Sequence, residues 1–268
     1  MSVTQACLFL GITRQAHYKR CLTHVARHKF EQRIVDFVMI ERMVQPRIGS
    51  RKLQHLMALQ QLFIGRDHLF SLLASRHLLV SPKRAYHKTT HSHHRFHCHP
   101  NLIKAGFIPK QPEQLWVADI TYLPTVSGNT YLSLVTDAYS RKIVGYHLDN
   151  NMRVDSVKQA FSKALVQRQT STPLIHHSDR GIQYCSHEYQ QLHQQYHTQC
   201  SMTDGYDCYQ NALAERVNGI LKSEYLLVKP KDLTEARKMV EESIMIYNQR
   251  RPHTALKYKT PDEVHQAF

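Results

Sequence analysis

Three carboxylates in the C-terminal part of the chain have a spacing that could support metal-dependent chemistry on a phosphate group. Asp119 and Asp179 are separated by 59 residues, and Asp179 and Glu215 by 35. Carboxylate oxygens are hard ligands that select Mg²⁺ or Mn²⁺. Three of them from separate elements can hold two ions on one phosphate, one activating the attacking oxygen and one stabilising the leaving oxygen. The spacing therefore predicts a phosphoryl-transfer site with two Mg²⁺ or Mn²⁺ ions.

The surroundings of Asp119 bear on this interpretation. The residue lies in the apolar run Val117-Ala118-Asp119-Ile120, where burying an anion is costly unless a cation compensates it. The structural alternative is that Asp119 is a salt-bridged strand residue and Glu215 a solvated helix residue. Either carboxylate taken alone fits that alternative better. The set of three favours the metal site.

The pattern of residues around the carboxylates predicts an α/β domain. Short β-rich segments separated by turns are expected at residues 115–123, 131–136, 142–147 and 173–178, and helices at residues 154–168, 188–196, 211–227 and 233–249. This order is typical of an RNase H-like fold, in which a mixed five-stranded sheet is flanked by helices. Asp119 would lie within the first strand, Asp179 just after the fourth, and Glu215 in the first turns of a helix.

Charge divides the chain at residue 112. Residues 1–112 hold 18 Lys and Arg against 4 Asp and Glu, whereas residues 113–268 hold 17 of each. The whole excess of +14 therefore lies in the N-terminal part, together with 12 of the 20 histidines. This asymmetry predicts a polyanion-binding module joined to a neutral domain. A basic part that only confers solubility is the alternative.

The basic part predicts small helical DNA-binding units over residues 1–81. Residues 2–18 predict a helix, a turn at Gly11 and a second helix, the order of a helix-turn-helix. Further helices are expected at residues 30–44, 48–58 and 69–79, about five short helices in all. Six basic side chains are predicted to contact DNA: Arg14, Arg51, Lys52, Arg66, Lys83 and Arg84.

Residues 82–112 are predicted to form a basic, His-rich linker between this part and the catalytic domain, residues 113–268. Six histidines and Cys98 between residues 87 and 99 invite a metal interpretation. Their spacing lacks the paired two-residue gaps of structural zinc sites. A tether that faces phosphate is the favoured interpretation.

Several motifs in the C-terminal part resemble one known family. In order along the chain they are residues 116–122 (WVADITY), 177–184 (HSDRGIQY), 201–202 (SM), 211–216 (NALAER), 221–224 (LKSE) and 247–253 (YNQRRPH). Together they resemble the second-frame product of IS3-family insertion-sequence transposases, within the DDE retroviral-integrase superfamily. Residues 46–52 resemble the helical segment that precedes the catalytic domain in that family.

The resemblance implies a Mg²⁺-dependent DNA strand transferase that cuts the ends of its element and joins a 3′-hydroxyl to DNA. It implies that Asp119, Asp179 and Glu215 are the metal ligands and that Lys222 contacts DNA at the element end. Asn218 shares a helix face with Glu215 and Lys222 and could hold a phosphate or a metal-bound water.

The partners implied are double-stranded DNA, further copies of the chain, and the segment encoded by the first frame of the element. No signal peptide is expected from residues 1–10, because they lack a basic stretch before an apolar one. The place of action implied is the bacterial cytoplasm, at the nucleoid.

One position departs from the family pattern: Gln210 stands where the family has an Asp. The three carboxylates do not use that position, although a lost neighbouring carboxylate could change metal affinity. A regulator derived from an inactive or domesticated transposase is the alternative, and a nuclease of the RNase H type is a third. A protein that only binds DNA has no need for Asp119 in an apolar strand, so metal-dependent strand cleavage would discriminate between them.

Overall fold

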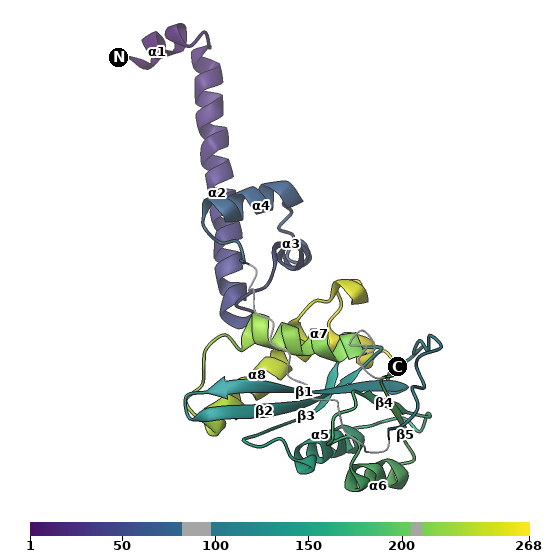
Figure 1. The fold of residues 1–268 in the computed structure, drawn as a ribbon. Coiled ribbons are helices and arrows are strands. Elements are labelled where there is room, and N and C mark those ends of the chain that lie inside the picture. The colour runs from purple at the N-terminus through teal and green to yellow at the C-terminus, as the bar shows by residue number, and fades with distance from the viewer. Residues whose placement is uncertain (82–97, 205–210) are drawn as a thin grey trace. The chain divides into compact units, whose positions relative to one another are not determined.

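The computed structural model describes residues 1–81, 98–204 and 211–268. The chain divides into two compact units, Met1–Ser81 and Pro82–Phe268 (Figure 1). The predicted contacts Lys83 and Arg84, most of the His-rich stretch and the departure at Gln210 lie outside the described residues.

The first unit is helical, as the sequence predicts. Its helices are α1 (Val3–Phe9), α2 (Arg14–Val44), α3 (Ser50–Leu59) and α4 (Arg66–Ser75). Ser2 begins α1 with a capping box, and the Thr13 side chain accepts a hydrogen bond from Ala16 at the start of α2. Gly11, with φ of +63°, makes the turn between the two helices, a conformation that glycine adopts without steric cost.

The expectation of about five short helices is wrong, because residues 14–44 form one helix of 31 residues. No Gly or Pro interrupts this segment, so nothing local ends the helix before Pro46. Only the second half of α2 packs, with α3 and α4, around a core that includes Ile34, Val38 and Leu53. The weak apolar pattern of residues 19–29 reflects exposure and not a break in the helix.

The second unit is built on a five-stranded mixed sheet, as predicted. Its strands are β1 (Leu115–Thr125), β2 (Gly128–Asp137), β3 (Ile143–Asp149), β4 (Ile175–Ser178) and β5 (Gln199–Met202), arranged in the order β3-β2-β1-β4-β5. The first three strands form an antiparallel meander, whereas β4 runs parallel to β1 and β5 parallel to β4. The parallel pairing of β1 with β4 brings the end of β4 beside the middle of β1.

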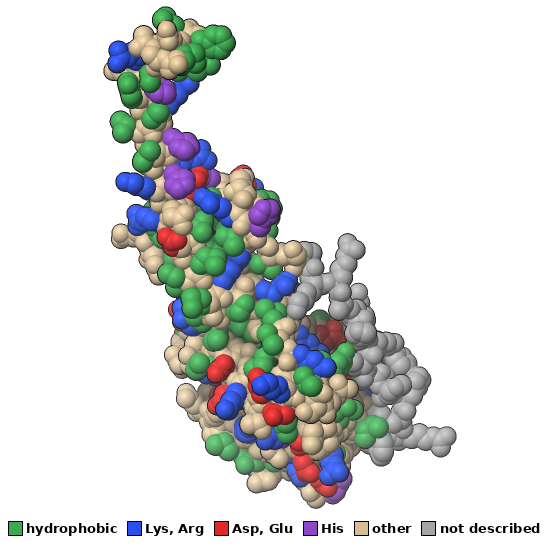
Figure 2. Space-filling model, turned by 90° about the vertical axis from the view of Figure 1, so that its left-hand side faces the viewer, with side chains coloured by type: hydrophobic (Ala, Val, Ile, Leu, Met, Phe, Trp, Pro, Cys, Tyr) green, Lys and Arg blue, Asp and Glu red, His purple; other side chains and the backbone are tan. Residues whose placement is uncertain are grey.

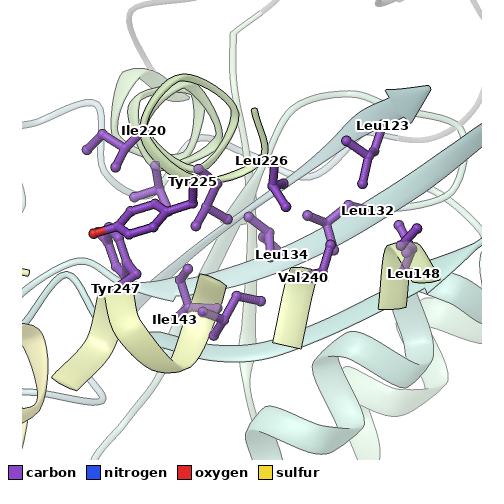
Figure 3. Packing of buried hydrophobic residues seen from close by; sticks show 14 residues of the cluster. Leu123, Leu132, Leu134, Ile143, Leu148, Ile220, Tyr225, Leu226, Val240 and Tyr247 are labelled. Carbon is purple, nitrogen blue, oxygen red and sulfur yellow. The ribbon is translucent and has the colours of Figure 1, made fainter. Parts of the chain in front are cut away.

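Helices cover both faces of this sheet (Figure 1). They are α5 (Val154–Val166), α6 (His187–Gln195), α7 (Ala212–Ile220), α8 (Leu233–Arg250) and α9 (Pro261–His265), with a π-helical turn (Leu221–Tyr225) after α7 and a 3₁₀ turn (Thr254–Leu256) after α8. Trp116 and Ala118 of β1 pack with α5 and α6 on one face. Leu123 of β1 packs with α7, the π-helical turn and α8 on the other (Figure 3). Because side chains alternate along a strand, Asp119 points to the α7 face.

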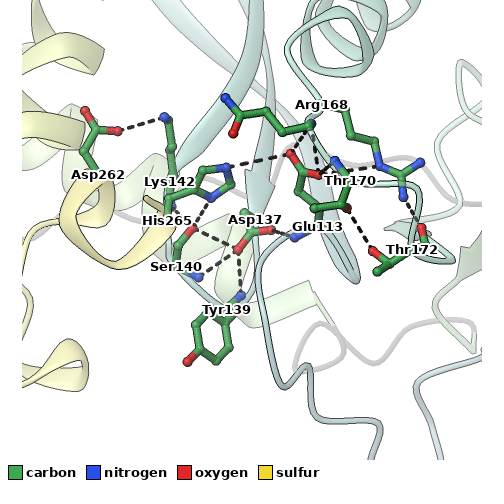
Figure 4. Close-up of polar contacts among 11 residues, drawn as sticks. Glu113, Asp137, Tyr139, Ser140, Lys142, Arg168, Thr170, Thr172, Asp262 and His265 are labelled. Atoms are coloured by element: carbon green, nitrogen blue, oxygen red, sulfur yellow. Dashed lines mark hydrogen bonds and ion pairs between the residues drawn. The ribbon is translucent and has the colours of Figure 1, made fainter. Parts of the chain in front are cut away.

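A buried polar network fixes the start of β1 (Figure 4). The Asp137 carboxylate accepts hydrogen bonds from the backbone of Glu113 at 2.7 Å and of Ser140 at 2.7 Å. The Glu113 carboxylate in turn accepts a hydrogen bond from the backbone of Thr170 at 2.8 Å. Ser140 also hydrogen-bonds His265 of α9. These contacts hold β1, the end of β2, the loop after α5 and the C-terminal helix in one arrangement.

Three local features differ from the sequence-based expectations or add to them. The helix expected over residues 211–227 is α7 followed by the π-helical turn, which shifts the register of Lys222 and Glu224. Residues 98–112, expected as part of the linker, pack on the second unit, where Leu102 donates its N–H to Ser201 Oγ at 2.9 Å. None of the helices in the described ranges combines the length and apolarity needed to cross a membrane.

Candidate active site

Asp119 lies in the middle of β1, opposite Leu134 of β2, with its side chain partly buried. Its Oδ2 accepts a hydrogen bond from Asn218 Nδ2 at 2.7 Å, and its Oδ1 accepts one from the backbone N–H of Ile120 at 2.9 Å. No ion pair involves Asp119 within the described parts of the chain. The salt-bridged strand residue of the structural alternative is therefore not what the fold provides.

The pKa of Asp119 is raised from its ordinary value of 3.8 to about 7. Burial is the largest cause, because the anion loses hydration, and the negative charge of Asp179 is the second. The hydrogen bonds from Asn218 and Ile120 oppose this rise, and the charge of Glu215 adds to it. Burial and the neighbouring carboxylates therefore disfavour the anion of Asp119, which forms no ion pair among the described residues.

Asp179 follows the last residue of β4, which puts it at the carboxyl end of that strand, next to β1. Its Oδ1 accepts a hydrogen bond from the backbone N–H of Gly181 at 3.0 Å. A Cβ on Gly181 would lie 3.1 Å from this same oxygen. Glycine at this position thus leaves room for the carboxylate of Asp179 against the turn that follows it.

Glu215 lies in the first turn of α7 and is exposed to solvent. Its pKa is raised, first by the partial desolvation of its carboxyl and second by the negative charge of Asp179. The charge of Asp179 therefore acts on both of the other carboxylates. The three groups come from β1, the end of β4 and α7, which the fold assembles from sites far apart in the sequence.

Two asparagines connect α7 to β1. Asn211, at the start of α7, donates from Nδ2 to the carbonyl oxygen of Ala118 at 3.0 Å, and Asn218 donates to Asp119 as described above. The amide oxygens Asn211 Oδ1 and Asn218 Oδ1 are buried and have no hydrogen-bond partner among the described residues. Buried acceptors of this kind are uncommon in folded proteins. Oxygen acceptors next to a carboxylate fit a hard cation or its bound water.

Lys222 lies in the π-helical turn with its Nζ 4.3 Å from the centre of the Tyr122 ring. Its pKa is lowered, mainly by burial, while the negative charge of Asp119 raises it. Tyr122 is on the same strand as Asp119, three residues later. The ring contacts the lysine, and the charge of Asp119 acts on it, so Lys222 lies near that carboxylate. The contact with Tyr122 is not evident from the sequence motif alone.

Among the described residues, no set of three His, Cys, Asp or Glu side chains is close enough to form a closed metal centre. The carboxylates are within electrostatic reach of one another, as their pKa shifts indicate, but are not drawn together. The chemistry of the donor set, carboxylates with two unpartnered amide oxygens, fits Mg²⁺ or Mn²⁺.

The remaining predicted DNA contacts belong to the first unit. Arg14, Arg51 and Arg66 are exposed in the first turns of α2, α3 and α4, and Lys52 in α3 is half-buried. Arg66 forms an ion pair with its neighbour Asp67. Cations at helix N-termini oppose the helix dipole, and they stand beside backbone N–H groups that attract phosphate.

Glu224, nine residues after Glu215, is a structural residue. Its two carboxylate oxygens accept hydrogen bonds from Arg251 Nη2 at 2.6 Å and Nε at 2.8 Å. Arg251 also contacts His253, so this ion pair ties the π-helical turn to the segment after α8. The partner of Glu224 lies 27 residues away along the chain, so the local sequence gives no sign of this ion pair.

Known family models match the second unit, and known relatives match most of the chain. Two family models, each described as an integrase core domain, match residues 109–208 and 196–261. The insertion element IS600 uncharacterized 31 kDa protein of Shigella sonnei is 33% identical over 254 residues, which cover 93% of each chain. Transposase InsF for insertion sequence IS3A of Escherichia coli strain K12 is 28% identical over 228 residues, covering 83% of this chain and 79% of that one.

Among solved structures, the simian T-cell lymphotropic virus intasome in complex with the PP2A regulatory subunit B56 gamma has a similar fold. The TM-score is 0.50 at 17% identity, and the match covers 81% of this chain and 70% of that chain. At this level of identity the likeness concerns the fold.

Proposed function

The chain belongs to the IS3-type insertion-sequence transposases of the integrase superfamily, as its motifs predicted, and we propose that it cuts element ends and joins them to DNA using two Mg²⁺ or Mn²⁺ ions held by Asp119, Asp179 and Glu215. The observation that carries this proposal is the raised pKa of Asp119, a partly buried carboxylate with no ion-pair partner in the described residues. Such a group is costly in a folded protein unless function requires it.

The chain's own groups support this chemistry in defined ways. When bound, the ions supply activation of the attacking oxygen and stabilisation of the leaving oxygen. Asn218 holds the Asp119 carboxylate in one orientation through its 2.7 Å hydrogen bond. Its unpartnered Oδ1 and that of Asn211 can accept hydrogen bonds from water held at the site. Gly181 leaves space for Asp179 beside the turn.

Lys222 is proposed to hold a phosphate of the element end next to the carboxylates. The Tyr122 ring packs under its Nζ and limits the positions that the side chain can take. Partial burial weakens its hydration, so a phosphate can replace water around the ammonium at a lower cost. The proposed partners of this chain are double-stranded DNA, further copies of the chain and the segment encoded by the first frame of the element. Its proposed place of action is the bacterial cytoplasm, at the nucleoid.

The first unit is proposed to supply most of the DNA affinity through Arg14, Arg51, Lys52 and Arg66, together with Lys83 and Arg84. Its charge supports this role, since residues 1–81 hold 12 Lys and Arg against 4 Asp and Glu, and residues 1–112 as a whole hold the entire positive excess. Under this proposal the domain boundaries predicted from the sequence separate a DNA-binding part, residues 1–81, from a catalytic part, residues 113–268.

The test is cleavage of a labelled DNA duplex that carries an element end, with Mg²⁺ or with EDTA. Asp119→Asn, Asp179→Asn and Glu215→Gln each preserve shape but remove one negative ligand, and each should lower cleavage by at least about a hundredfold. Binding of the duplex in EDTA should be unchanged or slightly tighter, because one anion beside the phosphates is lost. Asp155→Asn is the matched control, since Asp155 is an exposed first-turn residue of α5.

Two results would decide against the proposal. Cleavage that persists in any one of the three variants would remove that residue from the ligand set. A wild-type chain that binds the duplex but cleaves it neither with Mg²⁺ nor with Mn²⁺ would favour the regulator that lacks chemistry.

A further inference from the structure

Helix α2 exposes an apolar stripe on the face that points away from its own core. The core-facing side of α2 includes Ile34 and Val38, which are fully buried. About 100° of rotation per residue places a second group of side chains on the opposite side. These side chains, here named the outer stripe, are each at least half exposed: Tyr18, Leu22, Val25, Met39, Ile40 and Met43. Figure 2 shows apolar side chains among the Lys, Arg and His side chains over the first unit.

The residues of the outer stripe, apart from Ile40, have the spacing of a coiled-coil seam. Positions 18, 22, 25, 29, 32, 36, 39 and 43 follow at alternating steps of four and three residues, which keeps them in line along a helix that pairs with another. Apolar residues occupy both ends of this line. Lys29, Gln32 and Asp36 occupy its middle, where all three are exposed. A helix with a second apolar face gains stability by covering that face with another helix.

The charges of α2 select the partner and its direction. Residues 14–29 carry five Lys and Arg and no Asp or Glu, whereas residues 30–44 carry three acidic and two basic side chains. A parallel pair of α2 helices would place the two basic halves together and would stack Lys29 on the partner's Lys29. An antiparallel pair places each basic half along the partner's more acidic half. The complementary surface for α2 is therefore a second α2 running in the opposite direction.

We propose that the outer stripe forms a two-fold antiparallel dimer with a second copy of this chain. A pairing centred between Lys29 and Gln32 sets Leu22 against the partner's Met39 and Tyr18 against the partner's Met43. In the same register Lys29 lies one layer from the partner's Asp36, which it can reach with its long side chain. The pairing is isologous and closes at two copies. It uses none of the groups proposed for catalysis.

The first test is sedimentation equilibrium of the full chain without DNA. The wild type should be in monomer–dimer equilibrium, and Leu22→Gln combined with Val25→Gln should weaken dimerisation by about tenfold or more. His24→Gln is the matched control on the same exposed half of α2 but off the stripe, and it should dimerise as the wild type does. All three positions are exposed, so helical content by circular dichroism should remain that of the wild type.

The second test determines direction by exchanging charges. Lys29→Glu alone places two acidic groups together in the antiparallel pair, and Asp36→Lys alone places two basic groups together, so each should weaken dimerisation. The double exchange Lys29→Glu with Asp36→Lys should restore it. A parallel pair predicts no such recovery, because each position would face its own copy.

A wild-type chain that stays monomeric at high micromolar concentration would overturn the proposal, as would a dimer that Leu22→Gln with Val25→Gln leaves unchanged. A monomer whose DNA affinity falls in that variant would assign the outer stripe to DNA. A dimer that both single charge variants weaken and the double exchange does not restore would contradict the antiparallel arrangement.

Discussion

Replacing Asp119 by Asn should stabilise the metal-free second unit at alkaline pH and have a much smaller effect at acidic pH. Asp119 has a pKa of about 7 in the folded chain against 3.8 ordinarily. Between these values the folded chain keeps a proton that the unfolded chain has lost. Stability from this group is therefore complete below about pH 4 and is lost as the pH rises to about 7.

The size of the effect follows from the shift. One pKa unit corresponds to about 1.36 kcal/mol, so the wild type should lose on the order of 2–3 kcal/mol of unfolding free energy through Asp119 between pH 5 and pH 8. Asp119→Asn has no proton to exchange and escapes this loss. The difference in unfolding free energy between Asp119→Asn and the wild type should therefore shift in favour of the variant by on the order of 2 kcal/mol when the pH rises from 5 to 8.

Trp116 makes the measurement specific. It is the single Trp of the chain and is fully buried in the second unit, beside β2 and α5. Urea unfolding followed by its fluorescence in EDTA at pH 5 and pH 8 reports this unit alone. Adding Mg²⁺ at pH 8 should then stabilise the wild type and have a much smaller effect on the variant. An unchanged gap between the two proteins at the two pH values would refute the assignment of the raised pKa to Asp119, and equal Mg²⁺ stabilisation would refute its role as a ligand.

Three further changes test other parts of the site. Lys222→Gln should weaken binding of element ends and reduce the slope of log affinity against log salt by about one unit; gel-shift titrations at several salt concentrations measure this, and Lys238→Gln, exposed on α8, is the control that should leave the slope unchanged. Glu224→Gln should lower the unfolding free energy of the second unit by about 3 kcal/mol, because it leaves Arg251 buried without its carboxylate; Trp116 fluorescence measures the loss, and a variant as stable as the wild type would show that the ion pair contributes little. Gly181→Ala should slow strand cleavage through the new Cβ at 3.1 Å from Asp179 Oδ1, whereas Gly219→Ala, where a Cβ meets no atom within 4 Å, should cleave normally; equal rates in both would mean that the turn yields without moving Asp179.

The sequence predicted four of the five strands and placed Asp119 within the first and Asp179 just after the fourth, whereas β5 was not among the expected segments. Apolar, β-rich segments with turns between them mark β1, β2 and β3, and the apolar run around Asp119 marks a carboxylate that a strand must bury. The face to which Asp119 points then follows from alternation along the strand. These are local properties, which a single segment of sequence contains.

What the sequence could not predict depends on contacts between distant segments. The pairing of Glu224 with Arg251, the support of Lys222 by Tyr122 and the network from Glu113 through Asp137 to His265 each join elements that only the fold brings together. The continuity of α2 was missed for a different reason. Its first half does not contribute to the core that the second half forms with α3 and α4, and helix boundaries inferred from core-facing positions end where burial ends.

The raised pKa values of Asp119 and Glu215 favour the proposed metal-binding role of the carboxylates over a purely structural one. A structural Asp in a strand is expected to have a pKa below its ordinary value, because a cation or several N–H donors stabilise the anion. Here two donors are outweighed by burial and by Asp179, and the pKa rises to about 7. Glu215 shows the same direction although it is exposed and could turn away into solvent. A fold that keeps several carboxylates in mutual repulsion at one end of β4 gives up stability that neutral side chains would not cost. Under the proposed function, a cation bound among these carboxylates would offset that loss of stability.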